Sequence, residues 1–294
     1  MKLLITGASS TLGKNLTTEL LKIENFSIRL LEHRTPVEME TCETFKADIQ
    51  DAESLIQACS GIDVVIHLAA LTHSNDMKAY FEVNEIGTAK LLAACQENKI
   101  TRFIYISSAA ATEKAGEYGV SKLRGEEKVR SSNLDWVVLR PSEVYGPEMD
   151  EGMGKLFSWV KRFPVIPVIG DGSCFMSPVL LDDVVQAIVE IIKNDSLRNI
   201  ALNLCGPEEM TMDEVIDRFA RFHKVQRKKL HLPPWFVRLC ISFLSFFKLR
   251  FAFPDQVPRL LCEKDFAILT TQNAIPYKPK KIEEGLGYSQ SGES

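Results

Sequence analysis

The chain begins with MKLLITGASSTLGKNL at residues 1–16. The apolar run at 2–6 is typical of a buried strand, and residues 13–23 have the pattern of a helix. Gly7 lies where the strand must turn sharply, and Gly13 lies where the helix must pack closely on a sheet. Because the first N–H groups of a helix have no partner within it, this strand, turn and helix predict a place where an anion can bind.

Strands and helices alternate through the first half of the chain. Most of the predicted strands are apolar along their whole length, which is typical of strands buried on both faces of a parallel sheet. The helices between them would cover these faces, so the sequence predicts an α/β fold with a doubly wound parallel sheet. The predicted strands are 2–6, 26–32, 45–48, 62–70, 101–108 and 134–140, and the predicted helices are 13–23, 51–59, 82–97 and 117–130.

An acidic residue completes the pattern of a dinucleotide site. Glu32 ends the second predicted strand, nineteen residues after Gly13. A carboxylate at this place can accept hydrogen bonds from both ribose hydroxyls of an adenosine, while the helix start binds the pyrophosphate. The turn, the helix and the acid together therefore predict a Rossmann-type dinucleotide site.

The pattern changes near residue 141. Twelve of the 13 prolines lie from this residue onward, which indicates a region of different construction. Helices are predicted at 151–162, at 181–193 and after Thr211, and one further strand at 200–206. We therefore expect a dinucleotide-binding Rossmann domain at 1–141, joined by the strand near 200–206, and a smaller, discontinuous α/β substrate-binding lid at 142–294.

The overall composition excludes several classes of protein. The chain has 294 residues, of which 45% are hydrophobic and 25% charged, and this is ordinary for a globular protein with a large core. Its net charge of −4 argues against a general affinity for nucleic acid. The seven cysteines form no CxxC pair, and the histidines have no metal-ligand spacing. We therefore expect reduced thiols, no metal site and a cytoplasmic location.

One late segment, WFVRLCISFLSFFKLRFAF at 235–253, is strongly apolar. Four polar residues make it too polar for a clean membrane span, and their spacing places them in one narrow stripe on a helix. These residues are Arg238, Ser242, Ser245 and Lys248. Two interpretations stay open, namely a mostly buried helix and a helix that lies on a membrane or lines a lipid-shaped pocket.

Several motifs together resemble one family. TGASSTLG at 6–13 is similar to the TGxxGxxG turn of the extended short-chain dehydrogenase/reductase family, also called the NAD-dependent epimerase/dehydratase family. Ser10 replaces the middle glycine of this turn, and its side chain would crowd the pyrophosphate slightly. From Met1 to about Leu286, further segments resemble the later landmarks of the family in the right order: ADIQD, VIHLAA, VNEIGTAKLL, FIYISS, YGVSK, LRPSEVYGP, PVLLDDVVQAI and NLCGPEEMTMDEVI.

The resemblance implies a set of residues that bind the cofactor. Within it, Asp48 would contact the adenine, and the end of the fourth strand would line the cofactor. The complete set is Gly7, Ser9, Ser10, Thr11, Leu12, Gly13, Glu32, Arg34, Asp48, Ile49, Leu68, Ala69, Ala70, Tyr118, Lys122 and Pro141.

The choice between NAD and NADP depends on the end of the second strand. Glu32 favours NAD, because its carboxylate accepts the 2′-hydroxyl and would repel a 2′-phosphate. His33 and Arg34 follow immediately and could instead bind that phosphate. We expect NAD, and NADP stays open.

Four residues are candidates for catalysis. Tyr118 and Lys122 are four apart on a predicted helix and share one face. An ammonium group near a phenol favours the phenolate, so the phenol can exchange a proton at neutral pH. Ser108 ends the fifth predicted strand, where its hydroxyl can hold a substrate oxygen. The resemblance adds Asn84 as a supporting residue and implies hydride transfer between a carbinol carbon and a nicotinamide.

The resemblance also predicts the substrate class, with two departures. Most extended members act on nucleotide-diphosphate sugars, and Glu143 and Phe175 are the candidate substrate residues. Glu143 replaces the asparagine of RPxNVYGP, and Phe175 replaces an arginine expected after GDG. Both changes work against a diphosphate. Lys161, Arg162 or Arg259 could compensate for them.

Three functions therefore stay open. A nucleotide sugar is the expected substrate, and a hydrophobic sterol-like or lipid substrate is the alternative that the segment 235–253 favours. A non-catalytic NAD(P)-binding sensor or assembly subunit is the third. The loop between Ser108 and Tyr118 is shorter than is usual in the family, so we expect a pocket open on that side. The family resemblance also implies a homodimer.

Overall fold

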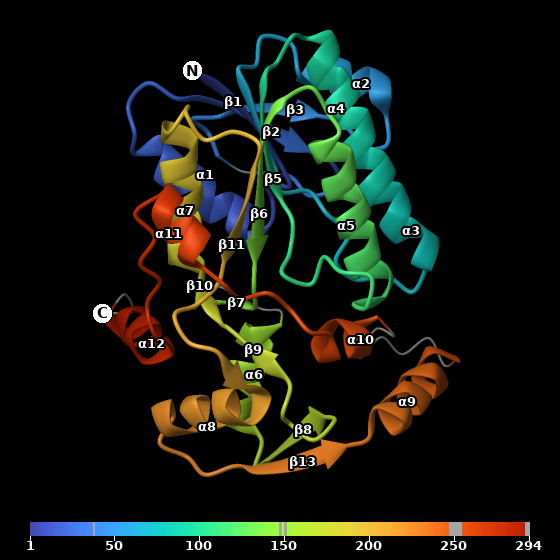
Figure 1. The fold of residues 1–294 in the computed structure, drawn as a ribbon, viewed down its shortest axis with the longest axis vertical. Helices are drawn as coiled ribbons and strands as arrows, with labels where there is room; N and C mark the ends of the chain where they lie inside the picture. Colours follow the sequence, from blue (N-terminus) through green and yellow to red (C-terminus); the bar gives the residue numbers. More distant parts are fainter. Residues whose placement is uncertain (38, 147–148, 150–151, 247–254, 292–294) are drawn as a thin grey trace.

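A seven-stranded parallel sheet forms the centre of the molecule (Figure 1). The computed structural model describes residues 1–37, 39–146, 149, 152–246 and 255–291. The strands lie in the order β11-β6-β5-β4-β1-β2-β3, which is doubly wound. Their bounds are β1 (Lys2–Thr6), β2 (Ser27–Glu32), β3 (Glu43–Lys46), β4 (Val64–His67), β5 (Arg102–Ile106), β6 (Asp135–Pro141) and β11 (Ile200–Leu204).

Helices cover both faces of this sheet, as Figure 1 shows. One face carries α1 (Thr11–Leu21) and α7 (Leu181–Lys193), and the other carries α2 (Ala52–Ala58), α4 (Thr88–Glu97) and α5 (Gly116–Arg130). Successive residues of β1 alternate between two cores, because Leu3 and Ile5 pack with α1 and α7 whereas Leu4 packs with α2 and α4. The predicted doubly wound α/β fold is confirmed.

The topological switch point of the sheet lies between β1 and β4. Strand order reverses at this point, and doubly wound sheets bind their ligands outside the carboxyl ends of the two strands at such a point. The register pairs Ile5 with Ile66 and Thr6 with His67. The segments that follow β1 and β4 therefore start side by side.

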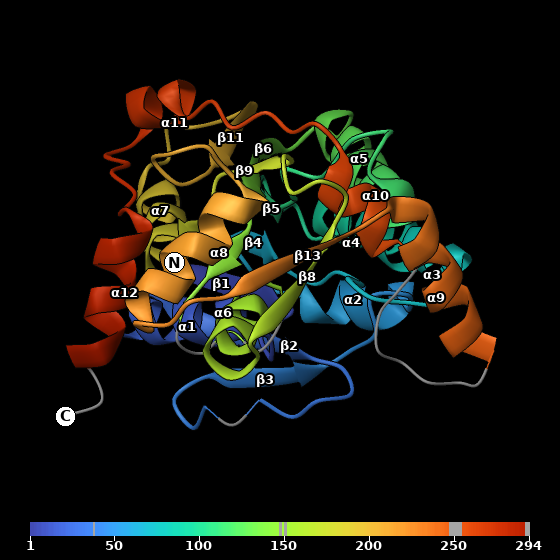
Figure 2. The same ribbon diagram turned by 90° about the horizontal axis from the view of Figure 1, so that it is seen from below.

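A smaller group of elements faces the carboxyl ends of the strands (Figures 1 and 2). It consists of a helix pair and three two-stranded sheets. The helices are α6 (Met153–Arg162) and α8 (Met212–Phe222), and the strands are β7 (Val144–Tyr145), β8 (Val165–Ile169), β9 (Phe175–Met176), β10 (Val179–Leu180), β12 (Met210–Thr211) and β13 (Lys228–Leu232). We call this group the lid. The predicted division of the chain at residue 141 stays a prediction.

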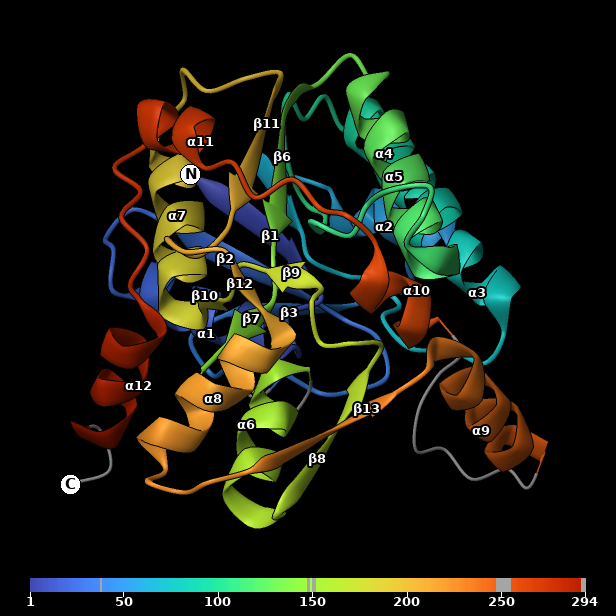
Figure 3. The ribbon, with the colours of Figure 1, turned by 60° about the horizontal axis from the view of Figure 1, so that its bottom comes forward.

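The C-terminal segment crosses back over the molecule. Figure 3 shows α10 between α5 and α9, where it packs against both. The prediction of an open pocket beside the short loop after Ser108 is wrong, because α10 packs against the N-terminal end of α5 there. The helices of this segment are α9 (Pro234–Phe246), α10 (Gln256–Leu261), α11 (Leu269–Ala274) and α12 (Ile282–Ser291).

Most of the large apolar side chains at the start of helix α9 are exposed, although Ile241 is buried. Trp235 is 68% exposed and Leu239 is 60% exposed, so the interpretation of a mostly buried helix is wrong for this part. Residues 247–253, the remainder of the apolar segment, lie outside the described residues. Within the ranges that the structure describes, no helix has the length and apolarity to cross a membrane.

Candidate active site

The turn between β1 and α1 leaves space that a side chain would fill. Gly7 has a φ of 70°, and a Cβ atom there would lie 2.6 Å from the nitrogen of Ala69. A Cβ atom on Gly13 would lie 2.5 Å from the carbonyl oxygen of Gly7. Both positions therefore require glycine, and the close approach of β1, β4 and α1 leaves backbone accessible to a ligand. These features fit the pyrophosphate of a dinucleotide.

Ser10 is the N-cap of α1. Its Oγ accepts a hydrogen bond from the N–H of Gly13 at 3.1 Å and donates one to the carbonyl oxygen of Gly7 at 2.7 Å. The hydroxyl therefore stabilises the turn by hydrogen bonds to the backbone on both sides of it. It does so at the position where the family pattern has a glycine. Ser9, Thr11 and Leu12 flank this cap in the turn and in the first residues of α1.

The end of β2 lies beside this turn. β1 pairs with β2 in parallel, with Ile5 opposite Leu30, so Glu32 and Gly7 lie at the same level. The carboxylate of Glu32 is half-buried and accepts the N–H of Val37 at 3.3 Å. Its place at the tip of β2 fits an adenosine ribose bound over the turn.

The residues that could hold a 2′-phosphate are differently placed. His33 Nε2 lies 3.2 Å from a carboxylate oxygen of Asp48, so this imidazole already has an acidic partner. Arg34 is exposed. The contact between His33 and Asp48 brings Asp48 to the tip of β2. The next residue, Ile49, contacts η1 (Glu82–Gly87) near Gly87.

A buried hydrogen-bond chain fixes the end of β4. Thr6 Oγ1 lies 2.7 Å from His67 Nδ1 and accepts the N–H of Ala69 at 3.2 Å. On its other side, His67 Nε2 lies 3.1 Å from Thr88 Oγ1. Burial lowers the pKa of His67 to about 3, and the nearby Lys122 acts in the same direction. His67 is therefore a neutral core residue that holds Leu68, Ala69 and Ala70 beside Gly7.

Asn84 connects two segments of the site. It lies in the π-turn η1, which interrupts the helical segment between α3 (Met77–Phe81) and α4. Its amide exchanges hydrogen bonds with the backbone of Leu71, with N–H to Oδ1 at 2.8 Å and Nδ2 to the carbonyl oxygen at 3.1 Å. The same Nδ2 donates to Ser121 Oγ at 2.9 Å. Asn84 therefore ties the loop after β4 to α5, and such π-turns often occur at functional sites.

Helix α5 carries Tyr118 and Lys122 toward the end of β5. Both side chains are buried, and Lys122 Nζ donates to the carbonyl oxygen of Ile106 at 2.8 Å. The ammonium also lies over the ring of Tyr105, 4.3 Å from its centroid. Burial lowers the pKa of Lys122 to about 7, against the opposite effect of a buried acid. Since Ser108 follows Ile106 by two residues, the structure brings the end of β5 and this face of α5 together.

The buried acid is Glu126, which sequence reasoning missed. Its carboxylate accepts hydrogen bonds from Ser107 Oγ at 2.6 Å and from two nitrogens of Arg140 at 2.8 and 2.6 Å. This network locks α5 to the ends of β5 and β6. The four-residue spacing from Lys122 to Glu126, which places both charges on one buried helix face, is the sequence signal that could have found it.

Two further residues contact α5 from the C-terminal segment: Asp255, which precedes α10, and Arg259, which lies in α10. Asp255 accepts the N–H of Tyr118 at 3.1 Å, so it caps the first turn of α5. A Cβ atom on Gly116 would lie 2.4 Å from this carboxylate, so glycine is required where α5 begins. The guanidinium carbon of Arg259 lies over the ring of Tyr118, 4.0 Å from its centroid. No local pattern links these residues, because 137 positions separate Tyr118 from Asp255.

Glu143 lies at the junction between the sheet and the lid and has a lysine partner. Lys264 Nζ lies 2.5 Å from Glu143 Oε1, and the lysine side chain is only 3% exposed. The positive charge offsets the carboxylate that the sequence places against a diphosphate. Pro141, two residues earlier, accepts the N–H of Ala109 at 2.8 Å and so borders the loop after Ser108.

The structure leaves the other predicted substrate residues on the surface. Phe175 lies on β9 and is 58% exposed. Lys161 and Arg162 are exposed at the end of α6, and the guanidinium of Arg162 lies over Phe163. Of the three cations considered as compensation for the missing arginine, Arg259 is the one that the structure places against Tyr118.

An open, solvent-facing cavity of about 540 Å³ lies between the lid and the C-terminal segment. Its walls come from the loop after β8, the junction of β13 and α9, and the end of α10. Apolar side chains and two polar groups face it, and the lining residues are Gly170, Asp171, His231, Pro233, Pro234 and Leu261.

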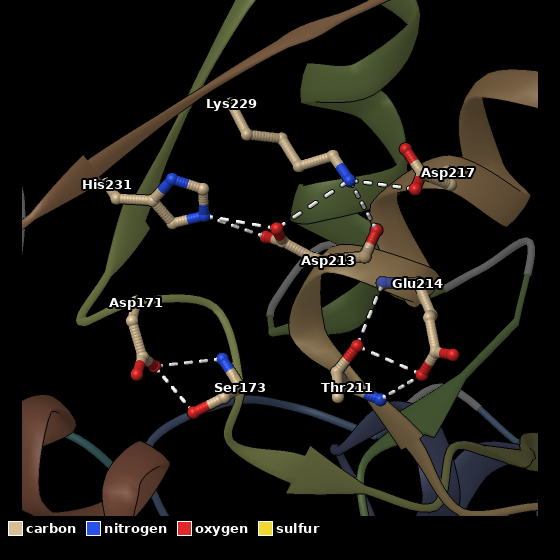
Figure 4. Close-up of polar contacts among 8 residues, drawn as sticks. All are labelled: Asp171, Ser173, Thr211, Asp213, Glu214, Asp217, Lys229 and His231. Atoms are coloured by element: carbon tan, nitrogen blue, oxygen red, sulfur yellow. Dashed lines mark hydrogen bonds and ion pairs between the residues drawn. The ribbon is translucent and has the colours of Figure 1, made fainter.

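Figure 4 shows how the polar groups near this cavity are held. His231 Nε2 lies 3.1 Å from both carboxylate oxygens of Asp213, which starts α8, and Lys229 Nζ also points at this acid. Asp171 accepts hydrogen bonds from the N–H and Oγ of Ser173. These hydrogen bonds lower the pKa of Asp171, so it is ionised at neutral pH. The figure also shows the start of α8, where Thr211 and Glu214 form a reciprocal capping box.

The chain is similar to known proteins over most of its length. Residues 3–205 match the model of the NAD dependent epimerase/dehydratase family. Ceramide reductase of Caulobacter vibrioides is 28% identical over 235 residues, which cover 78% of this chain and 73% of that protein. UDP-glucose 4-epimerase of Vibrio cholerae is 24% identical, with 97% of this chain and 93% of that protein covered. Three uncharacterised mycobacterial relatives are also 28% identical, but the match spans only 23% of their length.

A solved structure has the same fold over the full length. MoeE5 in complex with UDP-glucuronic acid and NAD superimposes with a TM-score of 0.79 and 20% identity, and the match covers 98% of this chain and 97% of that chain. The likeness extends through the lid as well as the sheet.

Proposed function

Because the chain belongs to the NAD dependent epimerase/dehydratase family, we propose that it is an oxidoreductase acting at a hydroxyl- or keto-bearing carbon of a nucleotide sugar. One observation carries this proposal. Lys122 binds the carbonyl oxygen of Ile106, which brings α5 with Tyr118 against the end of β5 with Ser108. After the carboxyl ends of β1 and β4, Gly7 and Ala69 lie in contact. In this proposal, a proton-transfer pair would face a dinucleotide cradle across the carboxyl ends of the strands.

The residues around Gly7 and Gly13 would hold NAD, with its pyrophosphate at the start of α1 and its adenosine ribose on Glu32. The placement of His33 favours NAD over NADP as the cofactor. Its imidazole is already paired with the carboxylate of Asp48, and this carboxylate would repel a 2′-phosphate. When bound, NAD supplies the acceptor and donor of the hydride.

The protein's own groups perform the proton chemistry. The hydroxyl of Ser108 would hold the substrate oxygen, and the phenol oxygen of Tyr118 would take the hydroxyl proton during oxidation and return one during reduction. In its protonated form, Lys122, fixed at the end of β5, would stabilise the phenolate, and its lowered pKa of about 7 would leave it partly protonated at neutral pH. Asn84 positions α5 through Ser121 and does not touch the substrate in this proposal.

Two features beside the lid support a nucleotide sugar. The cavity next to Leu261 offers apolar walls and the polar groups Asp171 and His231, which suits a nucleobase at the far end of the substrate. The Lys264 ammonium offsets the charge of Glu143, so the carboxylate is a weaker obstacle to a diphosphate than the sequence indicates.

The test is to mix the NAD complex with UDP-glucose or UDP-glucuronic acid and to follow the absorbance of the reduced nicotinamide. We expect Tyr118→Phe to lower the rate of reduction by about 100-fold or more. The matched control is Tyr80→Phe, because Tyr80 packs edge-on against Tyr118 and the substitution keeps that ring contact. A Tyr118→Phe protein as fast as the wild type would overturn the assignment of the proton-transfer residue.

A second candidate is an oxidoreductase of a lipid substrate that the protein reaches at a membrane surface. The exposed Trp235, Phe236 and Leu239 favour it, because they start α9 directly beside the prolines that line the cavity. Residues 234–253 contain three basic residues and no acid, so the segment complements anionic lipid. Ceramide reductase among the relatives agrees with this candidate.

Vesicle binding tests the second candidate. We expect the protein to sediment with vesicles containing phosphatidylglycerol and not with pure phosphatidylcholine. A Trp235→Ser/Leu239→Ser protein should bind less, whereas Trp159→Ser, a partly exposed tryptophan on α6, should bind as well as the wild type. Equal recovery with and without vesicles would remove this candidate.

We further propose a cytoplasmic location, which the unpaired cysteines of the sequence favour, and a homodimer, which the family resemblance implies. Fractionation of cells and light scattering of the purified protein test these two points.

A further inference from the structure

Arg259 is held over the ring of Tyr118 by the attachment of α10 to α5. Asp255, immediately before α10, accepts the N–H of Tyr118, and Arg259 lies one helical turn later. Gly116 allows this contact, because any Cβ atom there would collide with the Asp255 carboxylate. The position of the guanidinium relative to the phenol is therefore set by backbone contacts and by ring stacking.

The guanidinium keeps its hydrogen-bonding capacity. Arg259 is half-buried, and within the described part of the chain its side chain forms no ion pair or hydrogen bond. Its stacking partner is an aromatic ring, which leaves the N–H groups at the edge of the guanidinium plane. A half-buried guanidinium with free donors beside a proton-transfer residue is poised to bind a ligand.

The charges around Arg259 favour an anion. Lys122 lies close enough for the two cations to repel, and this repulsion adds to the effect of burial in lowering the pKa of Lys122. Asp255 is the acid on the same segment, but its carboxylate is already bound to the N–H of Tyr118, and burial raises its pKa against the opposite effects of this hydrogen bond and of the Arg259 charge. An anionic group on the substrate would relieve the repulsion between the cations.

We propose that Arg259 selects substrates that carry a carboxylate on the carbon next to the reacting one, as in a nucleotide-linked hexuronic acid. This inference rests on the proposed function. In a hexopyranose whose 4-hydroxyl contacts Tyr118, the sixth carbon is attached to the adjacent ring carbon, and its substituent would come within reach of the guanidinium that covers the phenol ring. A carboxylate there accepts two parallel hydrogen bonds from the guanidinium, whereas a neutral hydroxymethyl group gains one weaker bond.

Calorimetric titration of the NAD complex with UDP-glucuronic acid and UDP-glucose tests the inference, because the two probes differ only at the sixth carbon. We expect the wild type to bind UDP-glucuronic acid roughly tenfold or more tightly than UDP-glucose, and this preference to shrink at high salt. Arg259→Gln should remove the preference by weakening the binding of UDP-glucuronic acid more than that of UDP-glucose, and Arg259→Lys should keep part of the preference. The matched control Arg162→Gln, also an arginine stacked on a ring, should keep all of it.

The outcomes separate this inference from the function on which it rests. Equal affinity of the wild type for both probes, or a full preference in Arg259→Gln, overturns the role of Arg259 and leaves the proposed oxidoreductase intact. Binding of NAD but of neither probe overturns the nucleotide-sugar substrate, and this inference with it. If Arg259→Gln no longer binds NADH, the comparison of Arg259→Lys with Arg162→Gln decides, and an unreduced preference in Arg259→Lys counts against the inference.

Discussion

Asn84 Nδ2 donates to Ser121 Oγ at 2.9 Å, and Ser121 in turn donates to the carbonyl oxygen of Tyr118 at 2.8 Å. The helix with the proton-transfer residues is thereby joined to the loop after β4, which borders the dinucleotide cradle. A single buried amide thus connects the two halves of the proposed reaction.

Asn84→Ala should impair both stability and catalysis. The substitution leaves the N–H and carbonyl oxygen of Leu71 and the hydroxyl of Ser121 without their partner, which costs about 2 kcal/mol of unfolding free energy. The hydride-transfer rate should fall while NADH still binds. Asn98→Ala removes two amide hydrogen bonds at the end of α4 and should lower stability alone. Urea unfolding and stopped-flow absorbance distinguish the two variants.

Gly7→Ala should abolish NADH binding. Gly7 and Gly61 have nearly the same positive φ, 70° and 69°, so alanine costs a similar backbone strain of about 1 kcal/mol at both. Only at Gly7 does the new Cβ atom collide with the backbone of Ala69, whereas nothing lies within 4 Å at Gly61. Fluorescence titration should therefore show normal NADH affinity in Gly61→Ala. Normal affinity in Gly7→Ala would place the cofactor elsewhere.

The sheet and the turn after its first strand are predictable because they rest on local patterns. Apolar runs, the Gly7 turn and the distance from Gly13 to Glu32 are visible in consecutive residues, and the strands and helices of the sheet form within a few residues of their predicted bounds. The main difference is η1. In η1 the backbone hydrogen bonds join residues five apart, and not four apart as in an α-helix. The side-chain pattern of the sequence still predicts one continuous helix there.

The lid and the far wall of the site are not predictable in this way. Strands such as β9 and β12 have two residues each, which is too short for any periodicity. Asp255 and Lys264 meet their partners across 137 and 121 positions, so their roles depend on the tertiary fold. Arg259 could be named as a candidate cation from the sequence, but only its stacking on Tyr118 shows where it acts.

Lys122 should make stability depend on pH in the alkaline range. Burial lowers its pKa to about 7 from an ordinary value of 10.5, so between these pH values the unfolded chain binds more protons than the folded protein. Its contribution to the unfolding free energy therefore rises with pH, by up to about 1.4 kcal/mol per unit. Urea unfolding at a series of pH values should show that Lys122→Met loses this slope. Lys128→Met, on the exposed face of the same helix, should keep it.

Lys264→Met should destabilise the junction between the sheet and the lid. Removal of the ammonium leaves Glu143 with a charge in a mostly buried position, where Oε2 already has no hydrogen-bond partner. We expect a loss of about 3 kcal/mol. Lys264→Met/Glu143→Gln should recover most of it, because the uncompensated charge is gone. A double variant as unstable as Lys264→Met would show that packing, and not the ion pair, is responsible.

The most direct test of an NAD-dependent enzyme is a fluorescence titration with NADH and with NADPH. The wild type should bind NADH about tenfold or more tightly than NADPH. Glu32→Ala should weaken the binding of NADH and so reduce the difference between the two affinities. Glu24→Ala, an exposed acid before β2, should behave as the wild type. Binding of neither nucleotide, or a preference for NADPH that survives Glu32→Ala, would contradict the proposed cofactor site.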